Sequence, residues 1–114
     1  YESDYIVMQE DAADAARKAG GAPYRILADT FHMNIEEKSI AETLKRLADV
    51  IGYVHFADSN RRYPGSGHTD FAAAVRALRE TNYDGYVSFE CLPLPDPDTA
   101  ARESIGYIKK LLAL

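Results

Sequence analysis

Apolar residues recur every three or four positions in four stretches of the chain, which is the period of a helix that buries one face. The stretches cover residues 4–19, 40–51, 71–81 and 97–112. The second follows a capping box formed by Ser39 and Glu42. The fourth follows Asp96, with Pro97 at the first helical position. The pattern therefore predicts four helices, and Gly52 is expected to end the second of them.

Three short apolar runs lie between these helices and are typical of buried strands. They cover residues 24–29, 53–57 and 86–90. Turn residues rich in Gly precede each run, which supports a strand boundary there. Residues 30–34 are predicted to form a loop. Helices and strands thus alternate along the chain, beginning and ending with a helix.

The alternation indicates an α/β fold in which consecutive parallel strands are connected by helices. Three parallel strands alone leave long open edges, which makes a poor self-contained fold. The pattern fits a segment of a (β/α)8 TIM barrel, in which further strands close those edges, and a small three-layer sandwich is the alternative. We expect residues 1–114 to form one segment. No GxGxxG, GxSxG or P-loop motif points to a dinucleotide, hydrolase or nucleotide site.

Charge and composition narrow the range of partners. Thirteen Lys and Arg residues against eighteen Asp and Glu give a net charge of -5, which argues against a nucleic-acid surface. No apolar run approaches the roughly 20 residues that span a bilayer, so no membrane partner is expected. Cys91 is the single cysteine of the sequence, which excludes a disulfide within it and favours a cytoplasmic protein.

Each of the three strands ends in a residue type that can bind a metal. These residues are Asp29, His55 and Glu90. Taken alone, Asp29 could cap a helix, His55 could be a hydrogen-bonded core residue, and Glu90 could form a structural ion pair. Their equivalent places on successive strands favour a shared divalent metal, since imidazole and carboxylate ligands suit Mn²⁺, Mg²⁺, Co²⁺ or Zn²⁺. Glu90 could also act as a general base.

The loops after the strands carry further candidates. His32 and Arg61 are placed to bind substrate oxygens, and Arg61 is preferred over its neighbour Arg62. The Gly-rich stretch 65–67 could bind a phosphate through backbone N–H groups. A tight turn into the next helix is the favoured interpretation of that stretch.

Four blocks of the sequence resemble one family of proteins. They are Leu27-Ala28-Asp29-Thr30-Phe31-His32-Met33-Asn34, Val54-His55-Phe56-Ala57-Asp58-Ser59-Asn60-Arg61, Pro64-Gly65-Ser66-Gly67-His68 and Gly85-Tyr86-Val87-Ser88-Phe89-Glu90. In order and spacing they resemble the sugar isomerase/epimerase family of xylose-isomerase-like TIM barrels, the group of the D-tagatose 3-epimerases, D-psicose 3-epimerases and hydroxypyruvate isomerases. The resemblance covers nearly the whole chain.

The resemblance implies a metal centre, often occupied by Mn²⁺, that is held by Glu, Asp, His and Glu on the last four strands. Asp29, His55 and Glu90 would be the second, third and fourth of these ligands. It implies substrate-binding roles for His32 and Arg61, and Glu90 would be one of two catalytic glutamates. The reaction would be isomerisation or epimerisation of a ketose through a cis-enediolate, and the parent protein would be a homo-oligomer.

The resemblance also implies that the chain is the C-terminal half of its barrel, because a (β/α)8 barrel takes roughly 250 residues. The first glutamate ligand is expected just before Tyr1, and the chain by itself is expected to be inactive. Three alternatives remain: an inosose dehydratase-like lyase, an endonuclease that shares the barrel, and a non-catalytic module that assembles with another chain.

Overall fold

The computed structural model describes residues 2–114, which contain three strands and five helices. In chain order these are α1 (Gln9–Lys18), β1 (Ile26–Asp29), α2 (Thr30–Glu36), α3 (Ile40–Arg46), β2 (Ile51–Phe56), α4 (Phe71–Glu80), β3 (Tyr86–Phe89) and α5 (Pro97–Leu112). None of the helices within residues 2–114 combines the length and the apolar composition needed to cross a membrane.

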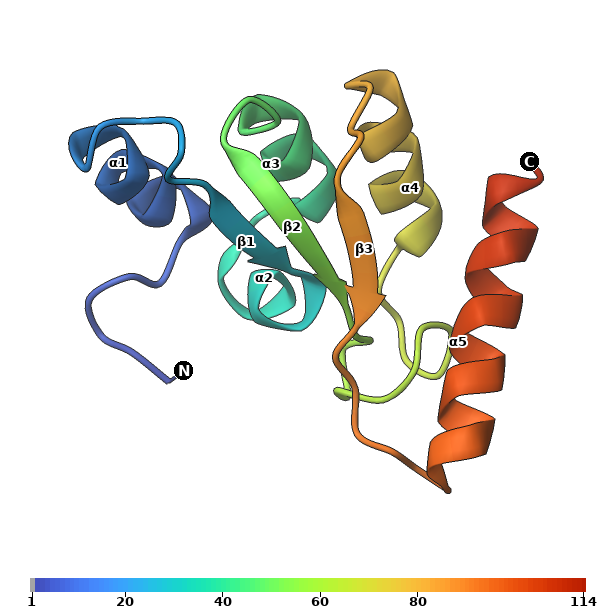
Figure 1. The fold of residues 1–114 in the computed structure, drawn as a ribbon. Coiled ribbons are helices and arrows are strands. Elements are labelled where there is room, and N and C mark those ends of the chain that lie inside the picture. Colours follow the sequence, from blue (N-terminus) through green and yellow to red (C-terminus); the bar gives the residue numbers. More distant parts are fainter. Residues whose placement is uncertain (1) are drawn as a thin grey trace.

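The three strands form one parallel sheet in the order β1-β2-β3, as the sequence predicts. Their carboxyl ends lie at the same end of the sheet, toward the bottom of Figure 1, where the loops 57–70 and 90–96 run. Tyr53 stands between Leu27 and Tyr86 in the register. Leu27 is 44% exposed and Tyr86 is 79% exposed, so this face of the sheet has no covering layer in the described chain.

The opposite face of the sheet packs on helices and forms the core. Alternation along the strands points Ala28, Val54 and Phe56 to this side, where all three are buried. Phe56 of β2 contacts Phe71 of α4 edge to face, with ring centroids 5.1 Å apart. Helices α3 and α4 lie behind the sheet in Figure 1 and are joined by a 2.8 Å ion pair between Lys45 and Glu80. The core therefore lies between one face of the sheet and the helices.

The number of helices differs from the prediction, which was four. Residues 30–34, predicted as a loop, belong to the additional helix α2. Asp29 caps this helix, since its carboxylate accepts a hydrogen bond from the backbone N–H of Phe31 at 2.9 Å. Met33 is 1% exposed and anchors the helix in the core. A helix of two turns shows too few apolar repeats for its period to be recognised.

Two predicted helix boundaries were also wrong. The first helix begins at Gln9 instead of residue 4, and the second ends at Arg46 instead of residue 51. Ile51 pairs with Ile26 in the sheet, so pairing with β1 overrides the helical period of its apolar neighbours. Gly52 lies within β2, where a Cβ atom would come 2.7 Å from the Cβ of Arg25. The glycine permits this close approach and does not end a helix.

Candidate metal centre

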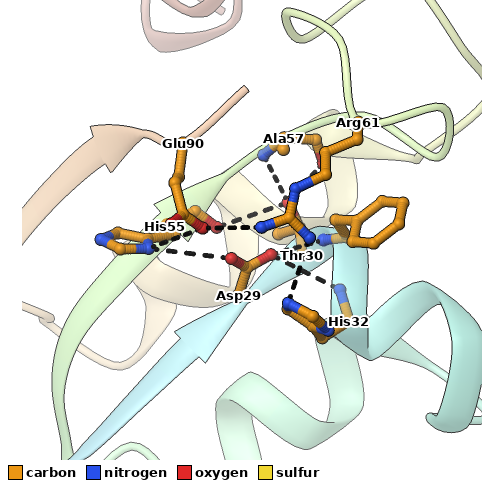
Figure 2. A network of polar contacts seen from close by, with 8 residues as sticks. Asp29, Thr30, His32, His55, Ala57, Arg61 and Glu90 are labelled. Carbon is orange, nitrogen blue, oxygen red and sulfur yellow. Dashed lines mark hydrogen bonds and ion pairs between the residues drawn. The ribbon is translucent and has the colours of Figure 1, made fainter. Parts of the chain in front are cut away.

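Asp29, His55 and Glu90 point toward one another at the carboxyl end of the sheet (Figure 2). The Nδ1 atom of His55 lies 3.7 Å from Oδ2 of Asp29 and 3.5 Å from Oε2 of Glu90. One ligand atom from each of the three residues lies within 4.8 Å of the other two. The structure thus gathers the three residues that the strand ends suggested.

The parallel register explains why these side chains meet. Asp29 stands beside His55 in the β1–β2 ladder, so both side chains project from the same face of the sheet. Glu90 follows the last residue of β3, and its backbone N–H donates to the carbonyl of Phe56 at 3.2 Å. This bond extends the pairing of β2 and β3 by one residue. The backbone pairing of the strands therefore brings three residues from three sequence segments close to one point.

The two carboxyl groups of the cluster differ in their ionisation. Burial raises the pKa of Asp29, which is 4% exposed, and a hydrogen bond with Glu90 raises it further. That hydrogen bond, with the charges of His55 and Arg61, lowers the pKa of Glu90. The two shifts make Asp29 the weaker acid of the pair and Glu90 the stronger one.

This donor set suits a divalent cation. A cation between the carboxyl groups would compensate the burial of their negative charge. One imidazole nitrogen and two carboxylate oxygens are ligands that Mn²⁺, Co²⁺, Zn²⁺ and Mg²⁺ accept in proteins. The residues present therefore fit a metal as the first three members of its coordination shell.

Arg61 lies beside the cluster and connects it to α2 (Figure 2). Its Nη2 donates to Oε2 of Glu90 at 3.3 Å, and its Nη1 is 3.3 Å from Nε2 of His32. A guanidinium can only donate, so the ring nitrogen of His32 accepts. The sequence predicted His32 and Arg61 near the metal candidates, and the structure places both there. Arg62, the alternative, is exposed.

Phe31 is a contact of this group that the sequence analysis missed. The Arg61 guanidinium carbon lies 4.7 Å from the centroid of the Phe31 ring, which is cation–π geometry. Arg61 also has a positive φ of 59°, which is uncommon for a residue with a Cβ atom. Its backbone is held by bonds from its N–H to the Asp58 carbonyl at 2.8 Å and from Leu92 N–H to its own carbonyl at 2.7 Å. The backbone bonds of Arg61 and the contact of its guanidinium with Phe31 therefore together fix the position of the guanidinium.

Asp58 organises the loop that carries Arg61, and it too was missed. The side chain is fully buried and accepts hydrogen bonds from the backbone N–H groups of Ser59, Gly65 and Thr69 at 2.7, 2.8 and 3.0 Å. One of these donors, Gly65, belongs to the Gly-rich stretch 65–67 that was considered as a phosphate site. Because Asp58 takes the N–H of Gly65, the stretch serves as a turn, the interpretation favoured from the sequence.

Burial acts to raise the pKa of Asp58, but backbone hydrogen bonds outweigh it and lower the pKa below the ordinary value of 3.8. A lowered folded-state pKa stabilises the fold above pH 3.8, and this contribution is lost as pH falls through the folded pKa. We expect Asp58→Asn to lower the free energy of unfolding at neutral pH by about 1.5–3 kcal/mol, the range for hydrogen bonds to a charged group. Urea unfolding of the variant should depend less on pH in the acid range than that of the wild type. Equal acid sensitivity of the two proteins would contradict this role.

A cavity of about 420 Å³ opens onto the cluster. Ile6, Val7 and Leu27 line it with apolar surface, while His32 and Arg61 contribute polar groups. The volume falls in the range of pockets for small organic molecules. The arrangement therefore combines a candidate metal site with space and hydrogen-bonding groups for a polar ligand of modest size.

Curated relatives of the chain include sugar epimerases. The chain is 43% identical over 86 residues to 3-dehydro-D-guloside 4-epimerase of Escherichia coli, an alignment that covers 75% of this chain and 33% of the relative. It is 37% identical over 90 residues to D-psicose 3-epimerase of Enterocloster bolteae, covering 79% of this chain and 30% of the relative. These alignments thus span about a third of the length of each relative.

The fold also matches a solved structure. D-allulose 3-epimerase from Methylomonas sp. superposes with a TM-score of 0.89 and 28% identity, over 97% of this chain and 45% of that one. The sequence of residues 2–111 matches the family described as xylose isomerase-like TIM barrel. These findings confirm the resemblance and the α/β barrel-type fold inferred from the sequence motifs. The chain therefore belongs to the xylose isomerase-like TIM barrel family.

Proposed function

We propose that this chain carries the metal centre of a divalent-metal-dependent sugar epimerase or isomerase that acts on ketoses. The observation that carries the proposal is the convergence of Asp29, His55 and Glu90 beside a cavity that also contains His32 and Arg61. The named epimerase relatives support a ketose or keto-sugar as the substrate class.

Asp29, His55 and Glu90 would hold the cation. Mn²⁺ is the first choice by resemblance to the family, with Mg²⁺, Co²⁺ and Zn²⁺ as alternatives that the same ligands accept. When bound, the cation supplies Lewis-acid polarisation of a substrate oxygen. Both carboxyl groups would serve as anionic ligands of the cation.

Glu90 is our candidate for the general base. It is the more exposed carboxylate of the cluster, with 51% of its side chain accessible, and its lowered pKa favours the ionised form that a base requires. It would remove the proton from the carbon beside the substrate carbonyl. Arg61 and His32 would bind the substrate oxygens and stabilise the negative charge of the resulting cis-enediolate.

Return of the proton to the opposite face requires a second acid, which we assign to another part of the barrel. The uncovered face with Leu27 and Tyr86 is a surface that a parallel sheet normally buries. We propose that residues 1–114 form the C-terminal half of a (β/α)8 barrel, and that further βα units cover this face and supply the second glutamate. We place the complete enzyme in the cytoplasm as a homo-oligomer.

Deuterium exchange tests the proposed reaction. The complete barrel, loaded with Mn²⁺, is incubated with D-psicose or D-fructose in D₂O, and the products are followed by NMR. We expect deuterium at the carbon that is epimerised, and loss of exchange after EDTA treatment. Failure to exchange a carbon-bound proton in these and other ketoses, including 3-keto-glycosides, would refute the function. Loss of water from the sugar would instead identify a lyase.

A further inference from the structure

Thr30 connects the ends of the two strands that carry Asp29 and His55 (Figure 2). Its hydroxyl accepts a hydrogen bond from the backbone N–H of Ala57 at 3.0 Å and donates to the carbonyl of the same residue at 2.8 Å. Both Thr30 and Ala57 have no exposed surface. One side-chain hydroxyl therefore satisfies two buried backbone groups of a segment 27 residues away.

These bonds lie where the regular pairing of β1 and β2 stops. The last pair in their register is Asp29 with His55, after which the chain at Thr30 turns into α2. Thr30 follows Asp29 directly, and Ala57 comes two residues after His55. The Thr30 hydroxyl thus gives Ala57 the hydrogen bonds that a further backbone pair of the ladder would have supplied. It joins the two strands just beyond the candidate metal ligands.

We propose that Thr30 is a positioning residue, which sets the separation of Asp29 and His55 and thereby the affinity of the site for a divalent cation. The inference rests on the proposed metal centre. Without the hydroxyl, the buried N–H and C=O of Ala57 lose their partner and must move to find water or another group. Such a shift changes the geometry of ligands that must lie within a few tenths of an ångström of their places around the ion.

The test compares Thr30→Val with Thr30→Ser in the complete barrel, purified without metal. Each variant is titrated with Mn²⁺, and binding is followed by calorimetry and by the EPR signal of free Mn²⁺. Val keeps the branched shape of Thr but lacks the hydroxyl, whereas Ser keeps the hydroxyl. We expect Thr30→Val to bind Mn²⁺ roughly 10-fold more weakly or worse, as is typical for loss of a group that orients ligands. Thr30→Ser should retain an affinity close to that of the wild type.

Urea unfolding separates positioning from simple loss of stability. A destabilised variant that is still more than about 99% folded has an unchanged apparent affinity, because affinity falls only with the competent fraction. Thr43→Val is the matched control: Thr43 is also buried, and its hydroxyl donates to Oε2 of Glu37 at 2.9 Å, at the opposite end of α2 from Asp29. We expect it to be less stable in urea and unchanged in Mn²⁺ affinity.

The outcomes distinguish this inference from the proposed function. A wild-type protein that binds no divalent cation refutes the metal centre and the positioning role together. A wild type that binds Mn²⁺ alongside a folded Thr30→Val variant of equal affinity refutes the positioning role alone. If Thr30→Val does not fold, Thr30→Ala is compared with Thr30→Ser, since these differ by the hydroxyl only. Equal Mn²⁺ affinity in that pair also overturns the inference.

Discussion

Replacing Glu90 with Gln should abolish turnover while sugar binding largely survives, provided that both are measured at Mn²⁺ concentrations that saturate the variant, because Glu90 is also a candidate metal ligand. Gln keeps the shape of the side chain and can still accept a bond from Arg61, which lies 3.3 Å from Oε2 of Glu90. It cannot take up a proton at neutral pH, so the step that removes the proton beside the carbonyl has no base. A positioned general base contributes roughly 10²- to 10⁴-fold to a rate, and we expect kcat to fall by at least that range.

The measurement is steady-state epimerisation of the complete barrel, together with calorimetric binding of the sugar. Glu103→Gln provides the control, since Glu103 is exposed on α5 and belongs neither to the cluster nor to the lining of its cavity. It removes the same charge and should leave kcat unchanged. Near-normal turnover of Glu90→Gln would show that another group is the base.

Replacing Asp29 with Asn should remove metal binding without weakening the fold. Asp29 has two tasks, because its Oδ1 caps α2 by accepting from Phe31 N–H at 2.9 Å while Oδ2 faces His55 at 3.7 Å. Asn is as good a helix cap as Asp, so the first task survives. Loss of an anionic ligand should weaken Mn²⁺ binding by more than roughly 100-fold, beyond the effect of residues that only orient ligands.

Unfolding of the metal-free protein in urea provides a second test of Asp29→Asn. The raised pKa of Asp29 means that the folded state binds its proton more tightly than the unfolded state. This contribution is present at low pH and is lost as pH rises through the raised value, so ionisation of Asp29 destabilises the metal-free fold. Asn does not ionise, and we expect Asp29→Asn to be at least as stable as the wild type at neutral pH in urea unfolding.

Asp70→Asn is the matched control for Asp29→Asn. Asp70 caps α4 by accepting from Ala73 N–H at 2.9 Å, and it lies outside the metal cluster. The control should change neither stability nor Mn²⁺ affinity by a large amount. Tight Mn²⁺ binding by Asp29→Asn would exclude Asp29 as a ligand.

The sequence by itself determined the strands and the residues that end them. Short apolar runs between Gly-containing turns are local signals, and the alternation with helices makes consecutive strands parallel. Parallel strands bring their carboxyl ends to one edge, so Asp29, His55 and Glu90 were predictable as neighbours without coordinates. The caps at Ser39 and Asp96 were predictable for the same reason, because a cap bonds within three residues of itself.

Only the tertiary structure decided the contacts that hold those residues in place. Helix α2 is too short for a periodic signal, and Ile51 joins β2 because it pairs with Ile26, a pairing that no local pattern identifies. Thr30 reaches Ala57 across 27 positions of sequence, and the ring of Phe31 in α2 meets Arg61 of the loop 57–70. Periodicity and capping act over a few residues, whereas the supports of the site are side chains brought together by packing of the whole sheet.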